Sequence, residues 1–251
     1  MKTKKPYFFL LGGHDLEMLT IRELLEQNQY VQEKDYLDRH LGWGAKLSDY
    51  ADSFKKDKVN VAIELLEDTP QPPQYLRIDH HNELNTLPAS IEQVAALLNT
   101  PLSRHQQLVA ANDKGFIPAL QDFGASATEI ADIRRRDRAA QGVTDEDEHL
   151  AELSIQNSKE IVNGITVVKS LTPRFSTVAD GLFGRYKNLI VYNDTELTCY
   201  CTDKLIINNE LKNLLKKEKI SYGLSYFSIF SINISNHILN EIISSFLNQK
   251  E

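Results

Sequence analysis

The most informative segment of the chain reads Tyr75-Leu76-Arg77-Ile78-Asp79-His80-His81. Its first four residues are typical of a short β-strand, and the polar residues mark the end of that strand. In an open α/β sheet, residues that follow the carboxyl end of a strand lie in the crevice where ligands bind. Carboxylate and imidazole side chains there suit a divalent metal. Asp-His-His is rare by chance in a chain with 7 histidines, although a helix cap followed by two surface histidines is the alternative interpretation.

The regions around this segment predict strands and helices in alternation. Apolar runs at residues 7–11 and 59–66 indicate two more buried strands, and apolar residues at helical spacing indicate a helix over 14–27. Further helices, two of them opened by capping-box patterns, are expected over 91–98, over 102–111 and from 127 through the arginines at 134–136. This alternation predicts an α/β fold class, with a mainly parallel sheet flanked by helices.

The second half of the chain differs in composition. An acidic polar stretch over 141–148 separates the halves, and after Arg185 the chain contains neither arginine nor alanine. A second, smaller mixed α/β domain is predicted from strand-like runs at 164–169, 189–192, 195–201 and 221–234 and helical patterns at 208–217 and 237–247. We therefore predict a parallel-sheet domain over residues 1–144, a helical connector over 145–162 and the smaller domain over 163–251.

Length and composition exclude several classes of protein. The 251 residues are 25% charged and 41% apolar, which is ordinary for a soluble globular protein and excludes wholesale disorder. No apolar run approaches the roughly 18 residues of a transmembrane helix, and the run behind the basic N-terminus is too short for a secretory signal. With two cysteines, Cys199 and Cys201, a disulfide scaffold is not expected and a cytoplasmic location is predicted. The net charge of −7 argues against binding to long duplex nucleic acid, but not against a small phosphorylated substrate.

Potential metal ligands also follow the other predicted elements. The first strand leads into Gly12-Gly13-His14-Asp15-Leu16-Glu17, where Asp15 and Glu17 can point together at an ion, although His-Asp before a helix is more often an N-cap. Glu64 ends the second strand and Asp113 lies in a turn-like Asn-Asp-Lys-Gly sequence, so an exposed edge residue and a turn former are their alternative interpretations. Acidic and imidazole clusters at four element ends indicate a dinuclear site, in which two cations about 4 Å apart activate a water for phosphoester hydrolysis.

These motifs resemble those of the DHH phosphoesterase superfamily, which includes RecJ-like exonucleases, nanoRNases, cyclic-dinucleotide phosphodiesterases and family II inorganic pyrophosphatases. The resemblance rests on the strand followed by Asp79-His80-His81, the His/Asp cluster after the first strand and the downstream Asp113. It implies a DHH domain with a pair of Mn²⁺ ions and a smaller DHHA1-type domain that closes over it. Tyr222 and Gly223 lie in a sequence similar to the glycine-rich DHHA1 signature, with one glycine kept, which implies substrate binding.

The resemblance implies a role for each matching residue. His80 would be a metal ligand, His81 the phosphate contact and Asp79 the residue that orients them. The other metal ligands would be Asp15 and Glu17 for the two aspartates of the first motif, Glu64 for the second motif and Asp113 for the fourth.

This sequence departs from the family pattern at several of these positions. The histidine of the first motif falls on Leu11, which cannot bind a metal, so His14 is the nearby substitute. Glutamate replaces aspartate at Glu17 and Glu64, and Asp68 is a rival to Glu64. These departures leave both one ion and a rearranged pair open.

Cations suited to substrate phosphates occur in both halves. Arg134 and Arg138 share one face of a predicted helix and belong to the densest cationic cluster of this acidic chain. A phosphate clamp, an inter-subunit contact and a solvated helix face all fit that pattern. Arg174 and Arg185 lie near predicted strands of the second half and are assigned to the distal part of a nucleotide, although lone arginines are more often surface residues.

The single tryptophan lies in the sequence Leu41-Gly42-Trp43-Gly44-Ala45. Glycines on both sides predict a tight loop. Stacking of Trp43 on a nucleotide base is one interpretation, and packing in the core or at a domain edge is the favoured one.

The sequence therefore predicts a cytoplasmic, metal-dependent phosphoesterase with one or two ions, Mn²⁺ or else Mg²⁺ or another divalent metal. The expected substrate is a small nucleotide, a short single-stranded oligonucleotide or a cyclic dinucleotide, with neither long duplex nucleic acid nor a membrane as partner. A homo-oligomer stays open. The main alternative is a lapsed family member that binds a nucleotide or a protein partner without turnover, and an inorganic pyrophosphatase is the third.

Overall fold

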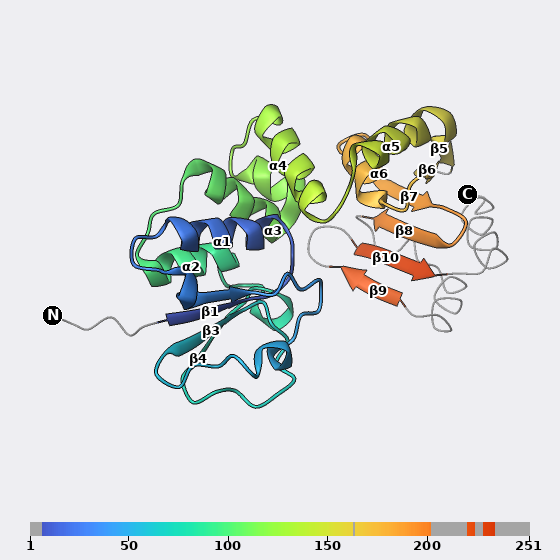
Figure 1. Ribbon diagram of the computed structural model, residues 1–251. Coiled ribbons are helices and arrows are strands. Elements are labelled where there is room, and N and C mark those ends of the chain that lie inside the picture. Colours follow the sequence, from blue (N-terminus) through green and yellow to red (C-terminus); the bar gives the residue numbers. More distant parts are fainter. Residues whose placement is uncertain (1–6, 163, 202–219, 224–227, 234–251) are drawn as a thin grey trace. The chain divides into compact units, whose positions relative to one another are not determined.

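The computed structural model describes residues 7–162, 164–201, 220–223 and 228–233. The chain forms two compact units, Met1–Gly142 and Val143–Glu251, each with its own β-sheet (Figure 1). Among the described helices, none combines the length and the apolar character needed to cross a bilayer.

The first unit is built on a parallel sheet. In spatial order its strands are β2 (Tyr36–Asp38), β1 (Tyr7–Leu11), β3 (Val59–Ile63) and β4 (Tyr75–Ile78). Every pairing in this sheet is parallel, and Ile63 is in register with both Leu11 and Ile78. The carboxyl ends of these strands therefore lie at one edge, and the prediction of a mainly parallel sheet is confirmed.

Both faces of this sheet are covered, so its central strands are buried on both sides. The helices of the unit are α1 (Leu16–Gln27), α2 (Ser90–Leu98), α3 (Arg104–Asp122) and α4 (Ala127–Ala140). Because side chains alternate along a strand, Phe9 and Leu11 pack against residues of α1 and α2, while Phe8 and Leu10 pack on the opposite face. That opposite face is closed by the 3₁₀ turn η2 (Leu47–Tyr50). A near-continuous apolar run such as β1 is typical of a strand buried in this way.

The turn-like sequence at residues 112–115 coincides with a break inside α3. The backbone leaves the helical conformation at Gly115 and Phe116, where Phe116 has a φ of 53° and a ψ of −143°. Pro118 explains the position of the kink, since its ring would clash with the carbonyl group of Lys114 in a regular helix. Asp113 therefore lies in the last regular turn before the kink.

The second unit contains a mixed sheet of six strands. Their spatial order is β5 (Glu160–Val162), β6 (Ile165–Lys169), β7 (Asn188–Tyr192), β8 (Glu196–Cys201), β10 (Ser228–Asn233) and β9 (Ile220–Gly223). Only the β6–β7 pairing is parallel in this described sheet. Its described helices are α5 (Asp145–Ser158) and α6 (Phe175–Gly181), which pack together over β6 and β7. The prediction of a second, mixed α/β domain is confirmed.

Several predicted element bounds need correction. The strand-like run over 221–234 is two strands, β9 and β10, which pair in antiparallel fashion. The strand expected over 59–66 ends at Ile63, and the short elements β2, β5 and α6 were not predicted. The helices expected over 208–217 and 237–247 lie outside the described residues. The ranges 1–144, 145–162 and 163–251, and the roles given to them, stay predictions.

Candidate metal centre

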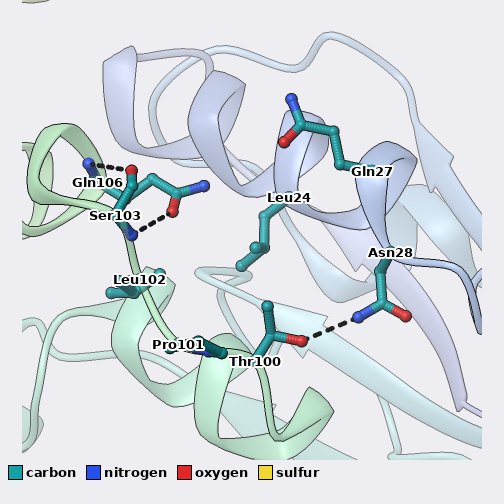
Figure 2. A pocket seen from close by; sticks show the side chains of 8 residues that line it. All are labelled: Leu24, Gln27, Asn28, Thr100, Pro101, Leu102, Ser103 and Gln106. Carbon is teal, nitrogen blue, oxygen red and sulfur yellow. Dashed lines mark hydrogen bonds between the residues drawn. The ribbon is translucent and has the colours of Figure 1, made fainter.

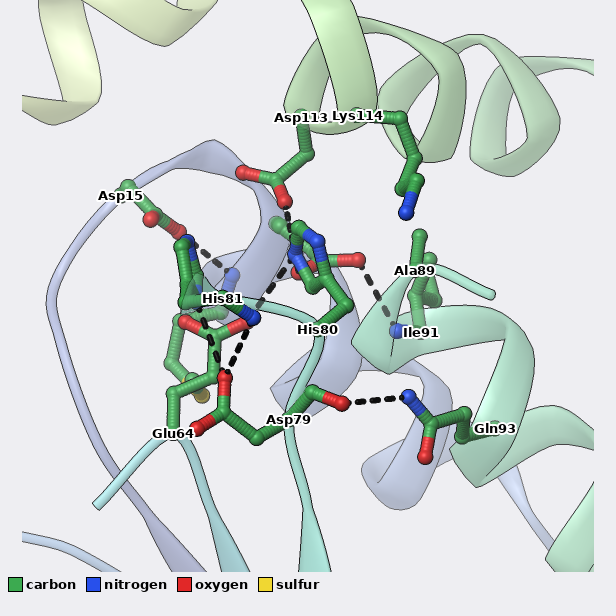
Figure 3. A network of polar contacts seen from close by, with 12 residues as sticks. Asp15, Glu64, Asp79, His80, His81, Ala89, Ile91, Gln93, Asp113 and Lys114 are labelled. Atoms are coloured by element: carbon green, nitrogen blue, oxygen red, sulfur yellow. Dashed lines mark hydrogen bonds and ion pairs between the residues drawn. The ribbon is translucent and has the colours of Figure 1, made fainter. Parts of the chain in front are cut away.

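Polar side chains gather at the carboxyl edge of the parallel sheet (Figure 3). Glu64 follows β3 directly, and His80 and His81 follow β4. Asp113 reaches the same place from α3, and Glu17 from the first turn of α1. This edge of the sheet thus brings together residues that are far apart in the sequence. They come from the ends of β3 and β4, from the first turn of α1 and from α3.

The imidazole of His80 is at the centre of this cluster. Its Nε2 lies 3.6 Å from Glu17 Oε2 and 3.6 Å from Glu64 Oε1, and it contacts Asp113 Oδ2. All four atoms are buried, and within the described part of the chain none of them makes a hydrogen bond. Buried polar atoms without partners cost free energy. One nitrogen and three carboxylate oxygens that face one another in this way are a donor set that fits a divalent cation.

A second grouping of ligand atoms overlaps with the first. Single donor atoms of Glu64, His80, His81 and Asp113 all lie within 4.8 Å of one another. His81 is therefore close enough to share the site, and Glu64, His80 and Asp113 belong to both groupings.

The backbone segments that follow β1 and β3 lie against each other at Gly12 and Glu64. Glu64 has a φ of 52°, a left-handed conformation that costs free energy for a residue other than glycine. Gly12, at the end of β1, packs directly on its backbone, and a Cβ at this position would lie under 3.0 Å from the carbonyl oxygens of Ile63 and Glu64. Gly12 is thus required for the approach of two strand ends. This is a structural role for Gly12.

Three acidic residues in and beside the cluster have raised pKa values. Burial raises the pKa of Asp15 to about 8, and the nearby charges of Glu64 and Asp113 add to the shift. Burial, followed by repulsion from Asp113, raises the pKa of Glu17 well above its usual value and also raises the pKa of Glu64. Like charges in a desolvated site must be neutralised by protons or by a cation.

Asp79 lies below the cluster and holds His81 and Arg77. Its Oδ1 accepts hydrogen bonds from the backbone N–H of His81 at 2.9 Å and from the imidazole Nδ1 at 3.0 Å, and its Oδ2 accepts one from Arg77 at 2.6 Å. Although burial opposes it, these bonds from His81 and Arg77 hold the pKa of Asp79 below its usual range. The hydrogen bond to Asp79 also raises the pKa of His81 to about 9 despite partial burial, so His81 is cationic at neutral pH.

Sequence reasoning missed two residues that support this arrangement. Arg77 stands two residues before Asp79, a spacing that puts side chains on one face of an extended chain, and this signal was available. Gln93, on α2, donates from its amide to the backbone carbonyl group of Asp79 at 3.0 Å, and nothing in the sequence marks it. Together they fix the loop that carries both histidines.

The predicted ligands that follow β1 occupy different positions around the cluster. Asp15 is buried beside Glu64 and His81 (Figure 3), and it is also the N-cap of α1, where its Oδ1 accepts a hydrogen bond from Met18 N at 2.8 Å. Glu17 has one oxygen in the cluster, while the other accepts a hydrogen bond from Ile91 N at 2.9 Å. His14 lies outside the grouped ligand atoms and packs edge-on against His40.

The structure shows where Leu11 and Asp68, the two uncertain positions of the family pattern, lie. Leu11 is fully buried in the core cluster under α1 and α2. Asp68 is exposed and accepts hydrogen bonds from Ser48, so of the two rivals it is Glu64 that lies with His80.

The predicted substrate-binding arginines lie in different surroundings. Arg134 is 6% exposed and donates to Asn112 and Asp137 inside the first unit, whereas Arg138 is half-buried on the same helix. Arg174 and Arg185 are exposed residues of the second unit at the two ends of α6. Tyr222 and Gly223 lie in β9 of that unit. These residues therefore belong to two separately described units, and their use in one substrate site stays a prediction.

Trp43 is not a core residue of the first unit, while the other part of the favoured interpretation, packing at a domain edge, stays a prediction. Its side chain is 76% exposed, and its ring packs edge-on against His81 with 6.2 Å between the ring centroids. The only tryptophan thus lies beside the cluster and faces solvent.

A separate hollow of about 400 Å³ lies near the other end of α1 (Figure 2). It is lined by Leu24, Gln27, Asn28, Thr100, Pro101, Leu102, Ser103 and Gln106. The polar groups pair with one another, as in the 3.0 Å hydrogen bond from Asn28 to Thr100. None of the lining side chains titrates or commonly binds a metal, so this hollow lacks the chemistry of the strand-end cluster.

The metal-free protein is expected to lose stability as the pH rises between 3.8, the ordinary value for an aspartate, and about 8, the raised pKa of Asp15. In this window the folded site retains protons that the unfolded chain has released, so each added pH unit costs about 1.4 kcal/mol per retained proton. A divalent cation displaces those protons, and its stabilising effect should therefore grow with pH. Denaturant midpoints at several pH values, with chelator and with Mn²⁺, measure both slopes. Stability in chelator that rises with pH across this window would contradict the pKa shifts.

Comparison with known proteins agrees with this fold. No family model and no curated protein matches the sequence. Among solved structures, a pGpG-specific phosphodiesterase, PggH from Vibrio cholerae, is similar over 96% of this chain and 98% of its own, with a TM-score of 0.53 and 13% identity. The DHH domain of a member of a family of ribosomal proteins is similar over 98% of this chain and 87% of its own, with a TM-score of 0.53 and 12% identity. The resemblance to DHH proteins is therefore confirmed at the level of the fold.

Proposed function

We propose that this protein is a divalent-metal-dependent phosphoesterase that acts on small nucleotides or short single-stranded oligonucleotides. The observation that carries the proposal is the convergence of four buried atoms without hydrogen bonds, on Glu17, Glu64, His80 and Asp113. A purely structural core has no reason to keep three carboxylates against one imidazole. The similar fold of a pGpG-specific phosphodiesterase supports the choice of substrate class.

The donor set favours Mn²⁺ over Mg²⁺, because imidazole nitrogen suits transition metals and Mg²⁺ prefers oxygen ligands and water. Glu64, His80 and Asp113 would hold the first ion, and Asp15 and Glu17 would complete its sphere or bind a second, with His14 as a further candidate. A bound divalent cation would neutralise phosphoryl oxygens and lower the pKa of the attacking water.

The chain itself would position the substrate. The imidazolium of His81 would donate to the phosphate, and Asp79 would keep its proton on Nδ1, which leaves Nε2 free to face the substrate. In the second unit, Arg174 and Arg185 would bind the distal part of the nucleotide. The β9 pair Tyr222 and Gly223 would contact the substrate, as the family resemblance implies. Because Arg134 is only 6% exposed whereas Arg138 is half-buried, we propose Arg138 as the better candidate of that pair.

Metal removal tests the proposed activity. The full chain, purified and loaded with Mn²⁺, should cleave a ribodinucleotide such as pGpG to mononucleotides, and treatment with a chelator should remove the activity until Mn²⁺ is restored. Product formation is followed by chromatography. A protein that cleaves equally well after exhaustive chelation would not be a metal-dependent phosphoesterase.

One observation favours the lapsed alternative. Leu11 is buried in the core at the position where the family has a metal-binding histidine, so the first unit lacks one ligand of a complete pair. A protein that takes up metal and binds the dinucleotide without cleaving it would be the nucleotide-binding sensor. Pyrophosphate, offered under the same conditions, distinguishes the pyrophosphatase.

A further inference from the structure

The apolar side chain of Trp43 is highly exposed to solvent. A tryptophan side chain offers a large apolar surface, and highly exposed ones in a soluble domain are unusual. Trp43 is 76% exposed, the highest value among the large apolar side chains of the described residues. Large exposed aromatic residues beside polar sites commonly mark binding surfaces.

The loop that carries Trp43 is held firmly at its C-terminal side. Gly44 has a φ of 81°, which allows the tight turn, and Ala45 and Leu47 are buried. Leu66 N donates to Ala45 O at 2.9 Å, and Leu47 N donates to Leu66 O at 2.9 Å. The loop is therefore tied to the segment that follows Glu64, so the indole ring is presented from a fixed position beside the metal centre.

The distance from Trp43 to His81 matches the dimensions of a nucleotide. The two ring centroids are 6.2 Å apart, and the rings meet at 75°. In a nucleotide one ribose separates the phosphate from the base. A phosphate held by His81 and the metal would thus place its base within reach of the indole, whose exposed surface is available for stacking.

We propose that Trp43 is the base-stacking platform of this site and binds the nucleotide whose phosphate reacts. The inference rests on the proposed function for the position of the phosphate. It restricts the substrate to phosphate esters that carry a nucleobase or a comparable flat ring. Because stacking requires no particular hydrogen-bonding edge, all four bases should be accepted.

Fluorescence tests the platform directly, since the chain has a single tryptophan. In the Mn²⁺-loaded full chain, GMP should quench the emission of Trp43 saturably, whereas ribose 5-phosphate, which has no base, should not. Equal quenching by both compounds, or no saturable quenching by GMP, overturns the proposal. The second outcome would leave Trp43 as a contact for a protein partner.

Variants give an independent measurement. Trp43→Ala should raise the Kd for GMP, measured by calorimetry, by about 5- to 150-fold, which corresponds to the loss of one base–aromatic stack. Trp43→Phe should recover most of the affinity because it keeps a flat ring. Tyr30→Ala is the matched control, since Tyr30 is a 70% exposed aromatic residue just beyond the other end of α1. Equal GMP affinity in the wild type and Trp43→Ala would overturn the platform.

The dinucleotide assay separates this inference from the function on which it rests. Quenching by GMP without any hydrolysis would keep the platform and reject the catalytic proposal. Hydrolysis without a Trp43-dependent GMP affinity would keep the phosphoesterase and reject the platform.

Discussion

His80→Ala is expected to lower dinucleotide hydrolysis by about 10³-fold or more and to remove the tight binding of Mn²⁺. The imidazole is the one nitrogen donor among three carboxylates, and its Nε2 contacts or approaches all of them. Without it, Glu17, Glu64 and Asp113 lose the central atom of the donor set. The loss of a metal that stabilises transition-state charge costs several kcal/mol of barrier, and each 1.4 kcal/mol is about tenfold in rate.

Metal binding must be measured beside activity, because a misfolded variant would lose both. Calorimetric titration with Mn²⁺ and a thermal melt in chelator distinguish the two cases: His80→Ala should melt normally without metal and gain little from Mn²⁺. Asp113→Asn keeps the size of the side chain and should weaken metal binding in the same direction. His105→Ala is the matched control, since His105 is an exposed histidine in the first turns of α3. Full activity and unchanged Mn²⁺ affinity in His80→Ala would remove the metal centre from this site.

Sequence patterns located the strand-end residues well for a physical reason. Apolar runs define where β1, β3 and β4 lie, and a parallel sheet places all their carboxyl ends at one edge. Glu64 and His80 therefore meet although no local pattern links them. Asp113 was harder to place, because the Asn-Asp-Lys-Gly sequence is typical of a turn. Asp113 lies at the end of the first, regular part of α3, and the helix is interrupted at Gly115 and Phe116, just before Pro118.

Other features depend on tertiary packing and leave no signal in one sequence. The left-handed φ of Glu64 is compatible with the fold only because Gly12 lets the two backbones approach. The loop that carries Trp43 is tied to Leu66 by backbone hydrogen bonds and exposes the indole, whereas the residue type alone favoured packing in the core or at a domain edge. The cationic run around Arg134 looked like one surface, yet neighbouring arginines on a helix point about 100° apart, and Arg134 is buried while Arg135 is exposed.

Arg134→Ala is expected to destabilise the first unit by about 3–5 kcal/mol, because it leaves a buried charge without its partner. The guanidinium donates to Asp137 at 2.8 Å and to Asn112 at 3.0 Å, and it stacks over the Phe116 ring at 5.0 Å from the centroid. Arg134 and Asp137 are 6% and 5% exposed, so water cannot replace the lost bonds. The network also joins α4 to the turn of α3 that carries Asp113, so the variant should bind Mn²⁺ more weakly as well.

The neighbouring Arg135→Ala is the matched control and should change stability by no more than about 0.5 kcal/mol, since its side chain is 63% exposed and its contact with Asp132 is 3.3 Å. The double variant Arg134→Met/Asp137→Leu removes both charges and should recover much of the loss, which identifies the unpaired carboxylate as its cause. Free energies of unfolding from urea titrations in chelator measure all three. If Arg134→Ala is instead as stable as Arg135→Ala and raises KM for the dinucleotide, Arg134 is the phosphate clamp that the cationic run predicted, and its burial in the unliganded protein must be relieved when substrate binds.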